Sequence, residues 1–279
     1  MSKKHDIIWL ESVDSTNEEA KRHISDIDNL SVLSAFEQTA GRGQRGNKWT
    51  STPGENLMFS IVLKAPKISA KDQFVLNEIA SLSVVDFLSK HGISSRIKWP
   101  NDIYVGSKKI CGILIENSLR DSAVSSSIIG IGLNINQRNF NVNLLNPTSM
   151  VLCQAEEGPL DTHRCLEEFM DIFTSWHDRF LTSACDLSPL RQSYLSSLWR
   201  LGEPSRFIDY TFLPGGHLDG PMNICTEKVH DTGIPSSDQT GNEFPGIIRG
   251  LSPTGNLLVE NLSTGLTREF GFKEIGYIL

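Results

Sequence analysis

The sequence predicts an α+β protein in which a mixed or antiparallel sheet is covered by helices and is followed by a small C-terminal β-barrel. Between residues 96 and 134, short apolar runs are separated by tight turns, which favours antiparallel or mixed pairing. Two longer segments repeat apolar residues every three or four positions, as helices do. After Leu201, Gly, Pro and Asp become frequent and helical spacing disappears. We therefore expect two domains, residues 1–200 and residues 201–279.

The first elements are a short strand and a helix. An apolar run at residues 7–10 predicts the strand. Ser15 and Glu18 place a hydroxyl and a carboxylate three residues apart, which is the pattern of a capping box, and predict a helix that extends to about Ile27. The apolar runs at residues 31–36 and 57–63 predict the next two strands.

A second helix and a group of strands follow. Apolar residues recur every three or four positions between residues 69 and 91, which predicts an amphipathic helix that ends at Gly92. It is expected to cover the sheet. Four strands are predicted after it, at residues 96–99, 103–105, 110–116 and 128–134.

Two further helices precede the β-rich end of the chain. Residues 161–182 place aromatic and aliphatic side chains on one helical face, and residues 190–199 predict a shorter helix. A polar, glycine-rich stretch at residues 214–245 is expected to be a long loop. Strands are then predicted at residues 247–251, 257–260 and 267–272.

Composition indicates an ordinary soluble globular protein. The chain has 279 residues, 39% apolar content and a formal net charge of -7. No apolar stretch is long enough to span a bilayer or to form the core of a signal peptide, so we expect no membrane partner. Its five cysteines are scattered without a CxxC pair, which favours reduced thiols and a cytoplasmic location.

A glycine-rich loop at residues 38–51 is the first candidate site. Its glycines let peptide N–H groups approach an anion closely, and Arg42, Arg45 and Lys48 supply positive charge in an otherwise acidic chain. Trp49 offers an apolar face on which a purine can stack. These features predict a nucleotide ligand. The alternative is a solvated glycine turn with scattered basic residues.

Two better-known phosphate motifs do not fit this loop. Its glycines match the spacing of the dinucleotide fingerprint, but that motif needs a helix to begin at the last glycine. The residues that follow Gly46, ending in Pro53 and Gly54, cannot open a helix. A P-loop would require Gly-Lys-Ser or Gly-Lys-Thr, which this loop lacks.

A second candidate site follows the strand at residues 96–99. Pro100 favours an extended bend, from which Asn101 and Asp102 would project. Such a pair can hold a metal-bridged phosphate or a sugar hydroxyl, and Lys109 can neutralise a reacting carboxylate. Taken alone, the alternative is an Asn-Asp turn beside solvated lysines.

Together these motifs resemble the biotin protein ligase family. Five motifs occur in the family's order and approximate spacing over residues 7–200: Ser15-Thr16-Asn17, the glycine-arginine loop through Trp49, the segment 98–102, the segment 109–116, and the segment 130–136. The resemblance implies a ligase domain like that of class II synthetases, followed by an SH3-like C-terminal domain.

The resemblance also implies roles for individual residues. Arg42, Lys109 and Asp102 would be catalytic, and Asp102 would be the Mg²⁺ ligand. Trp49 would stack on adenine. The implied biotin-binding residues are Ser15, Thr16, Asn17, Gln38, Gly41, Arg42, Gly43, Gln44, Lys109 and Gly112. The implied nucleotide-binding residues are Arg45, Trp49, Asn101 and Asn134.

The activity that this resemblance implies has two steps. Biotin and MgATP would form biotinyl-5′-AMP, and biotin would then be transferred to a lysine of a biotin carboxyl carrier protein domain. Lipoate or octanoate ligases and transferases of the same fold, and a noncatalytic nucleotide-binding module, are the alternatives. Only about fourteen residues precede Ser15, which leaves no room for a helix-turn-helix, so we expect no DNA binding. A homodimer is possible.

The chain departs from the family pattern inside the glycine loop. Many family members carry two further arginines there, where this sequence has Gln44 and Asn47. We expect weaker electrostatic retention of the adenylate as a result.

Overall fold

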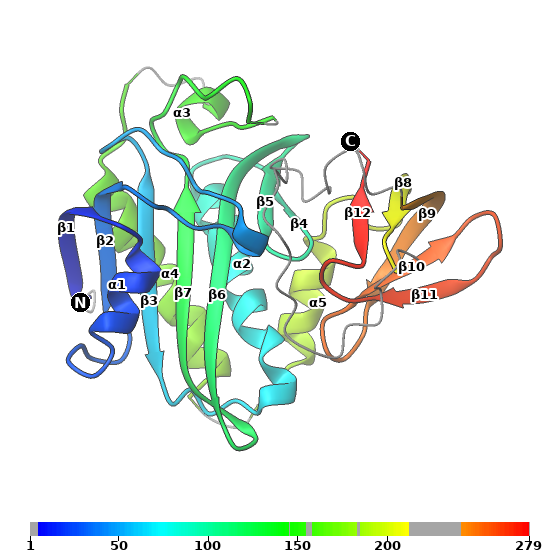
Figure 1. Ribbon diagram of the computed structural model, residues 1–279, viewed down its shortest axis with the longest axis horizontal. Coiled ribbons are helices and arrows are strands. Elements are labelled where there is room, and N and C mark those ends of the chain that lie inside the picture. The colour runs from blue at the N-terminus through cyan, green and yellow to red at the C-terminus, as the bar shows by residue number, and fades with distance from the viewer. Residues whose placement is uncertain (1–4, 145, 155–157, 183–184, 212–240, 279) are drawn as a thin grey trace.

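The protein folds around two β-sheets, which occupy opposite ends of the molecule in Figure 1. The computed structural model describes residues 5–144, 146–154, 158–182, 185–211 and 241–278. The larger sheet has seven strands and the smaller has five. This arrangement confirms the predicted α+β class.

The larger sheet is mixed, as predicted. Its strand order is β1-β2-β3-β7-β6-β5-β4, in which β1 and β2 are parallel and the other neighbours are antiparallel. Tight turns join β4 to β7 in succession, which is why these strands pair antiparallel. The strands are β1 (Ile7–Val13), β2 (Val32–Gln38), β3 (Leu57–Lys64), β4 (Arg96–Lys98), β5 (Asp102–Val105), β6 (Lys108–Arg120) and β7 (Ala123–Leu133).

Helices cover both faces of this sheet. The short α1 packs on one face, and α2 and α4 pack on the other (Figure 1). A short α3 went unpredicted because it is a single turn. The helices are α1 (Thr16–Arg22), α2 (Phe74–Lys90), α3 (Met150–Cys153), α4 (Thr162–Phe180) and α5 (Ser188–Ser196).

The expectation that α2 is amphipathic was wrong. Residues all around this helix are buried, and they include Asn77, Glu78, Ser81 and Ser83. The reason is that α2 lies between the sheet on one side and α4 and α5 on the other, so it has no solvent face along most of its length. The predicted end at Gly92 holds, because this glycine has a φ of 74°.

The predicted capping box of α1 was also wrong. Ser15 stands at the N-cap position but makes no side-chain capping hydrogen bond, and the helix ends at Arg22 and not near Ile27. Glu18 instead pairs with Lys21 and Arg42. By contrast, the side chain of Asp161 caps α4 by accepting hydrogen bonds from the backbone N–H groups of His163 and Arg164.

The smaller sheet is antiparallel and has the order β11-β10-β9-β8-β12. β8 and β12 went unpredicted because both are short and lack a continuous apolar run. The expected loop at residues 214–245 is wrong at its end, since β9 begins at Asn242; residues 212–240 lie outside the described residues. The strands are β8 (Pro204–Asp209), β9 (Asn242–Leu251), β10 (Leu257–Asn261), β11 (Thr267–Phe270) and β12 (Ile275–Tyr277). Barrel closure and the domain boundary at residue 200 stay predictions.

Aromatic contacts join the two sheets. The ring of Phe272 lies 5.2 Å from that of Trp99 and 6.0 Å from that of Phe74, measured between centroids. The Trp99 indole N–H also donates to the carbonyl of Gly255 at 2.9 Å. A side chain at Gly255 would overlap Phe74, so this contact requires glycine. These contacts hold the smaller sheet beside β4 and β5.

Successive side chains of a strand point to opposite faces of the larger sheet, so one set enters the core and the other set faces α1. In β3, Phe59 packs into the main core against Phe169 of α4, with ring centroids 5.2 Å apart. Its neighbour Ser60 contacts α1 on the other face. In the described part of the chain, no helix is long and apolar enough to cross a bilayer.

Candidate active site

An open cleft of about 1040 Å³, part of it solvent at the mouth, lies on the face of the sheet that carries α1. Its walls come from the start of α1, the glycine-rich loop, the strands β4–β7 and the last strand β12. The structure brings together in its lining most of the residues that the sequence predicted: Ser15, Thr16, Asn17, Gln38, Arg42, Gly43, Gln44, Trp49, Asn101, Asp102, Lys109 and Gly112.

A hydrogen-bond network fixes the Ser-Thr-Asn motif at one end of the cleft. The Gln38 side-chain oxygen accepts from the backbone N–H of Thr16 at 2.8 Å and from its hydroxyl at 3.2 Å. The Ser60 hydroxyl lies 2.8 Å from the Thr16 hydroxyl and donates to the Asn17 amide oxygen at 2.6 Å. The Asn17 amide donates to Glu116 at 2.8 Å. Rigid, buried polar groups of this kind suit a ligand with several hydrogen-bonding atoms.

Ser60 and Glu116 are functional candidates that the sequence reasoning missed. Ser60 was detectable as a hydroxyl within the otherwise apolar run of β3. Glu116 is the last residue of the segment 109–116, and the resemblance implies no role for it. Both depend on the fold, because each contacts Asn17 only when α1 packs on this face of the sheet.

At Gly130, the backbone of β7 lies directly beneath the Asn17 side chain of this network. A Cβ at this position would lie 2.2 Å from the Asn17 amide oxygen, so a side chain there must displace Asn17. Because the resemblance implies that Asn17 binds biotin, we expect Gly130→Ala to raise KM for biotin by about 10- to 100-fold, with a much smaller change in KM for ATP. Steady-state kinetics with each substrate varied in turn measures both constants. Equal changes in the two constants would contradict this assignment.

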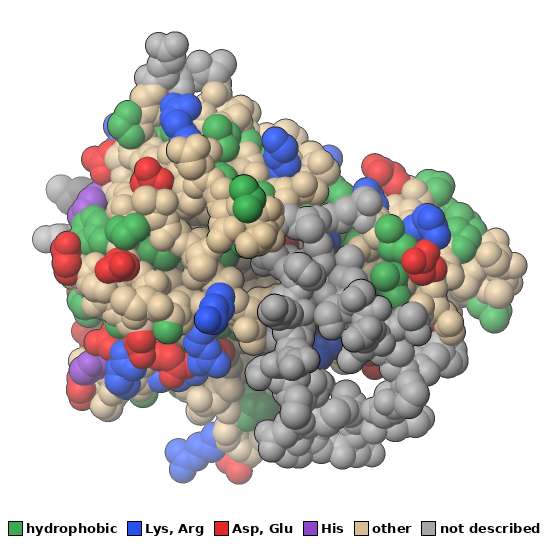
Figure 2. Space-filling view, turned by 45° about the horizontal axis from the view of Figure 1, so that its top comes forward, with side chains coloured by type: hydrophobic (Ala, Val, Ile, Leu, Met, Phe, Trp, Pro, Cys, Tyr) green, Lys and Arg blue, Asp and Glu red, His purple; other side chains and the backbone are tan. Residues whose placement is uncertain are grey.

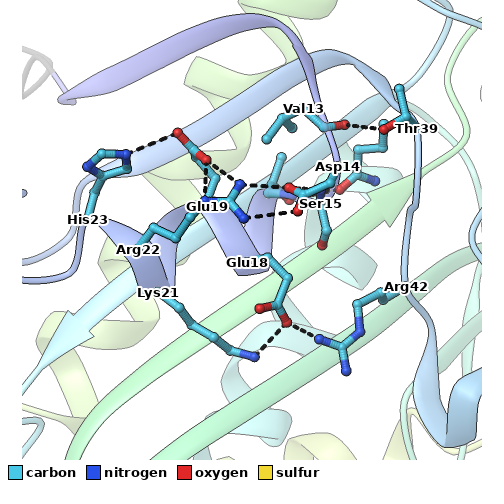
Figure 3. A network of polar contacts seen from close by, with 12 residues as sticks. Val13, Asp14, Ser15, Glu18, Glu19, Lys21, Arg22, His23, Thr39 and Arg42 are labelled. Carbon is cyan, nitrogen blue, oxygen red and sulfur yellow. Dashed lines mark hydrogen bonds and ion pairs between the residues drawn. The ribbon is translucent and has the colours of Figure 1, made fainter.

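Arg42 belongs to a network of ion pairs above the cleft floor. Its guanidinium pairs with Glu18, which also accepts from Lys21 at 2.8 Å (Figure 3). Lys21 in turn pairs with Glu116 at 2.7 Å. Burial raises the pKa of Glu116, but the hydrogen bonds from Lys21 and Asn17 and the charge of Arg42 outweigh this effect, so the net pKa is lowered. Glu116 therefore remains an anion that orients Lys21 and Asn17.

Trp49 lies flat against the glycines in the floor of the cleft. A Cβ at Gly132 would lie 2.4 Å from the indole ring, and one at Gly112 would lie 3.2 Å from it. These two glycines are opposite each other on β6 and β7. The indole N–H of Trp49 is buried and has no hydrogen-bond partner among the described residues. It is thus a donor available to a ligand.

Lys109 and Asp102 form an ion pair in the opposite wall, with 3.0 Å between the ammonium nitrogen and the carboxylate oxygen. The ammonium also lies 5.9 Å from the centroid of the Trp49 ring. Nearby, the Asn101 amide donates to the carbonyl of Ile113 at 2.5 Å, which ties the bend after Pro100 to β6. Asp102 and Lys109 are both largely buried, so their charges act at short range with little screening.

Two predicted residues, Gly41 and Asn134, are not among the described residues that line the cleft. Asn134 is buried and donates to the carbonyl of Thr148 at 2.9 Å, and Gly41 packs against the backbone of Trp49. The side chain of Arg45 lies outside the described part of the structure. Cys111 is fully buried, and burial raises the pKa of its thiol, which suits a packing residue and not a nucleophile.

The charge of the cleft suits a polyanion. Its described lining carries Arg42, Lys48, Lys98 and Lys109, against Asp102 as the one carboxylate. On the face drawn in Figure 2, Lys and Arg lie beside Asp and Glu at the lower left. Among the described residues, no cluster of three or more His, Cys, Asp or Glu side chains could hold a metal by itself. A single carboxylate fits Mg²⁺ that arrives bound to phosphates, because Mg²⁺ takes few protein ligands there.

Comparisons with known proteins agree with this geometry. The Biotin/lipoate A/B protein ligase family matches residues 9–134. The chain is 33% identical over 201 residues to a biotin–acetyl-CoA-carboxylase ligase from Paracoccus denitrificans, covering 70% of this chain and 82% of that one. The chain belongs to the biotin protein ligase family.

Two other relatives extend the comparison. A biotin protein ligase from Aquifex aeolicus, solved in complex with biotin and ATP, superposes with a TM-score of 0.71 at 25% identity over 97% of each chain. The bifunctional ligase/repressor BirA of Bacillus subtilis is 33% identical over 153 residues, which are 54% of this chain and 47% of that protein. The chain thus matches about half the length of that relative.

Proposed function

We propose that this member of the family is a biotin–protein ligase, which forms biotinyl-5′-AMP from biotin and MgATP and transfers biotin to a lysine of a biotin carboxyl carrier protein domain. The observation that carries the proposal is the cleft itself. A preorganised polar end at Thr16, Asn17 and Gln38 leads to a cationic wall at Lys109. One end suits a ureido group and the other suits a carboxylate beside a phosphate.

In the first step, the biotin carboxylate attacks the α-phosphate of ATP and pyrophosphate leaves. Lys109 is placed to stabilise the charge that develops on the phosphoryl oxygens, and its pairing with Asp102 holds its ammonium at the wall. Arg42 would exchange its contact with Glu18 for one with the substrate anions. Trp49 would stack on the adenine ring.

In the second step, a lysine amine attacks the acyl carbon of the mixed anhydride, the bond from that carbon to the phosphate oxygen breaks, and AMP leaves. A free lysine is protonated at neutral pH, and forming the neutral amine costs roughly 4 to 5 kcal/mol at a pKa near 10.4. Cationic surroundings from Arg42 and Lys109 would favour the neutral amine, and Asp102 would orient it by accepting a hydrogen bond.

The decisive experiment is biotin-dependent exchange of labelled pyrophosphate into ATP, with lipoate and octanoate offered in parallel. Exchange with biotin alone is the expected result, because the rigid donors and acceptors around Asn17 match a polar head group and not an alkyl chain. Exchange only with lipoate or octanoate would favour the ligases of the same fold. Nucleotide binding without exchange would favour a noncatalytic module.

Gln44 gives a prediction about how tightly the intermediate is held. Gln44 lines the cleft at a position where many family members carry arginine. We expect Gln44→Arg to slow release of biotinyl-5′-AMP by about 10-fold, since a charge-assisted hydrogen bond to the phosphate would replace a neutral one. The release rate is measured after rapid dilution of the preformed complex of enzyme and biotinyl-5′-AMP into a large volume of buffer that contains no carrier protein. A release rate equal to that of wild type would count against this prediction.

The partner and location assignments rest on the same proposal. The ligase names of the relatives support a carboxylase carrier domain as the acceptor. Homodimer formation, the absence of DNA binding and a cytoplasmic location stay predictions.

A further inference from the structure

Lys98 is a buried cation in the wall of the cleft, outside the residues assigned above. It is the last residue of β4 and its exposed fraction is 5%. Its ammonium donates to the Tyr104 hydroxyl at 3.1 Å and lies 5.5 Å from the centroid of the Tyr277 ring. These contacts hold the ammonium between the two sheets, because Tyr104 belongs to β5 and Tyr277 to β12.

Tyr277 brings a hydroxyl from the smaller sheet to the same wall. Its exposed fraction is 4%, and its ring packs between Trp199 and Phe207 at centroid distances of 5.8 and 5.3 Å. The hydroxyl has no hydrogen-bond partner among the described residues. Burial raises the pKa of this phenol, with a smaller opposing effect from Arg200, so it stays protonated and can donate. A buried donor in a cleft wall without a protein partner indicates a ligand atom.

The strand register places these groups beside the site of adenylation. Lys98 is directly opposite Asp102 in the β4–β5 pair, and directly opposed residues face the same side of a sheet. Asp102 pairs with Lys109, so two lysines flank one carboxylate. Lys109 is assigned to the α-phosphate. Lys98 therefore lies where the β- and γ-phosphates of ATP can reach its ammonium.

We propose that the Lys98 ammonium and the Tyr277 hydroxyl form the subsite for the pyrophosphate leaving group of ATP. The inference rests on the proposed ligase function. As the biotin carboxylate oxygen bonds to the α-phosphorus, the bond from that phosphorus to the bridging oxygen breaks, and the electron pair stays on pyrophosphate. Lys98 and Tyr277 donate hydrogen bonds to pyrophosphate oxygens as this charge develops. The smaller sheet thereby contributes to the first step.

Two variants and two assays test the subsite. Lys98→Met removes the charge, and Tyr277→Phe removes only the hydroxyl while keeping the packed ring. Pyrophosphate affinity is measured by product inhibition of adenylation. Transfer of biotin from supplied biotinyl-5′-AMP to a carrier domain is measured in a single turnover that needs no pyrophosphate. We expect pyrophosphate affinity to fall by about 100-fold in Lys98→Met and about 10-fold in Tyr277→Phe, with transfer within about 2-fold of wild type.

Tyr210→Phe is the matched control. Tyr210 is a buried tyrosine just after β8 and is not among the described residues that line the cleft, so its variant should leave both assays unchanged. Unchanged pyrophosphate affinity in Tyr277→Phe and Lys98→Met would overturn the subsite. So would an equal loss in both assays, which would indicate a structural role. Failure of wild type to transfer biotin from biotinyl-5′-AMP would instead overturn the ligase function.

Discussion

Lys109→Ala should lower biotin-dependent pyrophosphate exchange by about 10²- to 10³-fold, which corresponds to roughly 3 to 4 kcal/mol of transition-state stabilisation. Lys109 is held in the cleft wall by Asp102 at 3.0 Å and faces the floor that Trp49 covers. Its ammonium is therefore already in place when charge develops on the phosphoryl oxygens. The exchange rate at saturating biotin and ATP measures the effect.

The adjacent lysine provides the control for this prediction. Lys108 is exposed and is not among the described residues that line the cleft. Lys108→Ala should keep the exchange rate of wild type, which separates a specific role of Lys109 from a general loss of positive charge. If Lys109→Ala exchanged pyrophosphate as fast as Lys108→Ala, Lys109 would have no catalytic role.

Glu78→Gln should stabilise the protein by roughly 3 kcal/mol at pH 8 and have little effect near pH 4.5. Glu78 lies within α2 with an exposed fraction of 3%, beside a second cavity between α2, α5 and the turn that contains Gly255. Burial raises the pKa of its carboxyl to about 7, and Arg191 opposes this only in part. The folded protein therefore binds a proton at Glu78 that the unfolded chain has already released.

The sign of the pH dependence follows from this difference. Between pH 4.5 and about 7 the folded state binds more protons at Glu78 than the unfolded state does, so the contribution of this group to stability falls as pH rises. Well above pH 7 the Glu78 carboxyl is ionised in both states, so the folded protein bears the full free-energy cost of burying the carboxylate. Glutamine carries no charge at any pH and avoids this cost.

Denaturant unfolding of both proteins between pH 4.5 and 8 tests the prediction. Glu203→Gln, at an exposed position, is the control and should change stability by less than about 0.5 kcal/mol throughout. A difference between wild type and Glu78→Gln that did not vary with pH would show that the carboxyl does not titrate as proposed.

The contiguous parts of the site were predictable from the sequence. Arg42 and Trp49 share one loop, and Asp102 and Lys109 are separated by a single tight turn, so local spacing already predicted their proximity. The resemblance of five motifs then predicted that these segments meet in one cleft, and the structure places most of the named residues there.

For other residues, the local sequence provided either no indication or a misleading indication of their contacts. Glu78 sits in a helical repeat, where nothing in the sequence distinguishes a buried carboxylate from a solvated one. The capping interpretation of Glu18 failed because a local rule competes with tertiary ion pairs, and here Arg42 and Lys21 take the carboxylate. Asn134 occurs in a family motif, yet its amide binds Thr148.

By itself, the sequence determined the α+β class and the order of the main strands along the chain, because turns, apolar periodicity and residue types act over a few neighbouring positions. Only the tertiary structure decided that Ser60 supports Asn17, that α2 is buried all around, and that Tyr277 closes the wall beside Lys98. Those contacts join residues far apart in the chain, and they depend on how sheets and helices pack against one another.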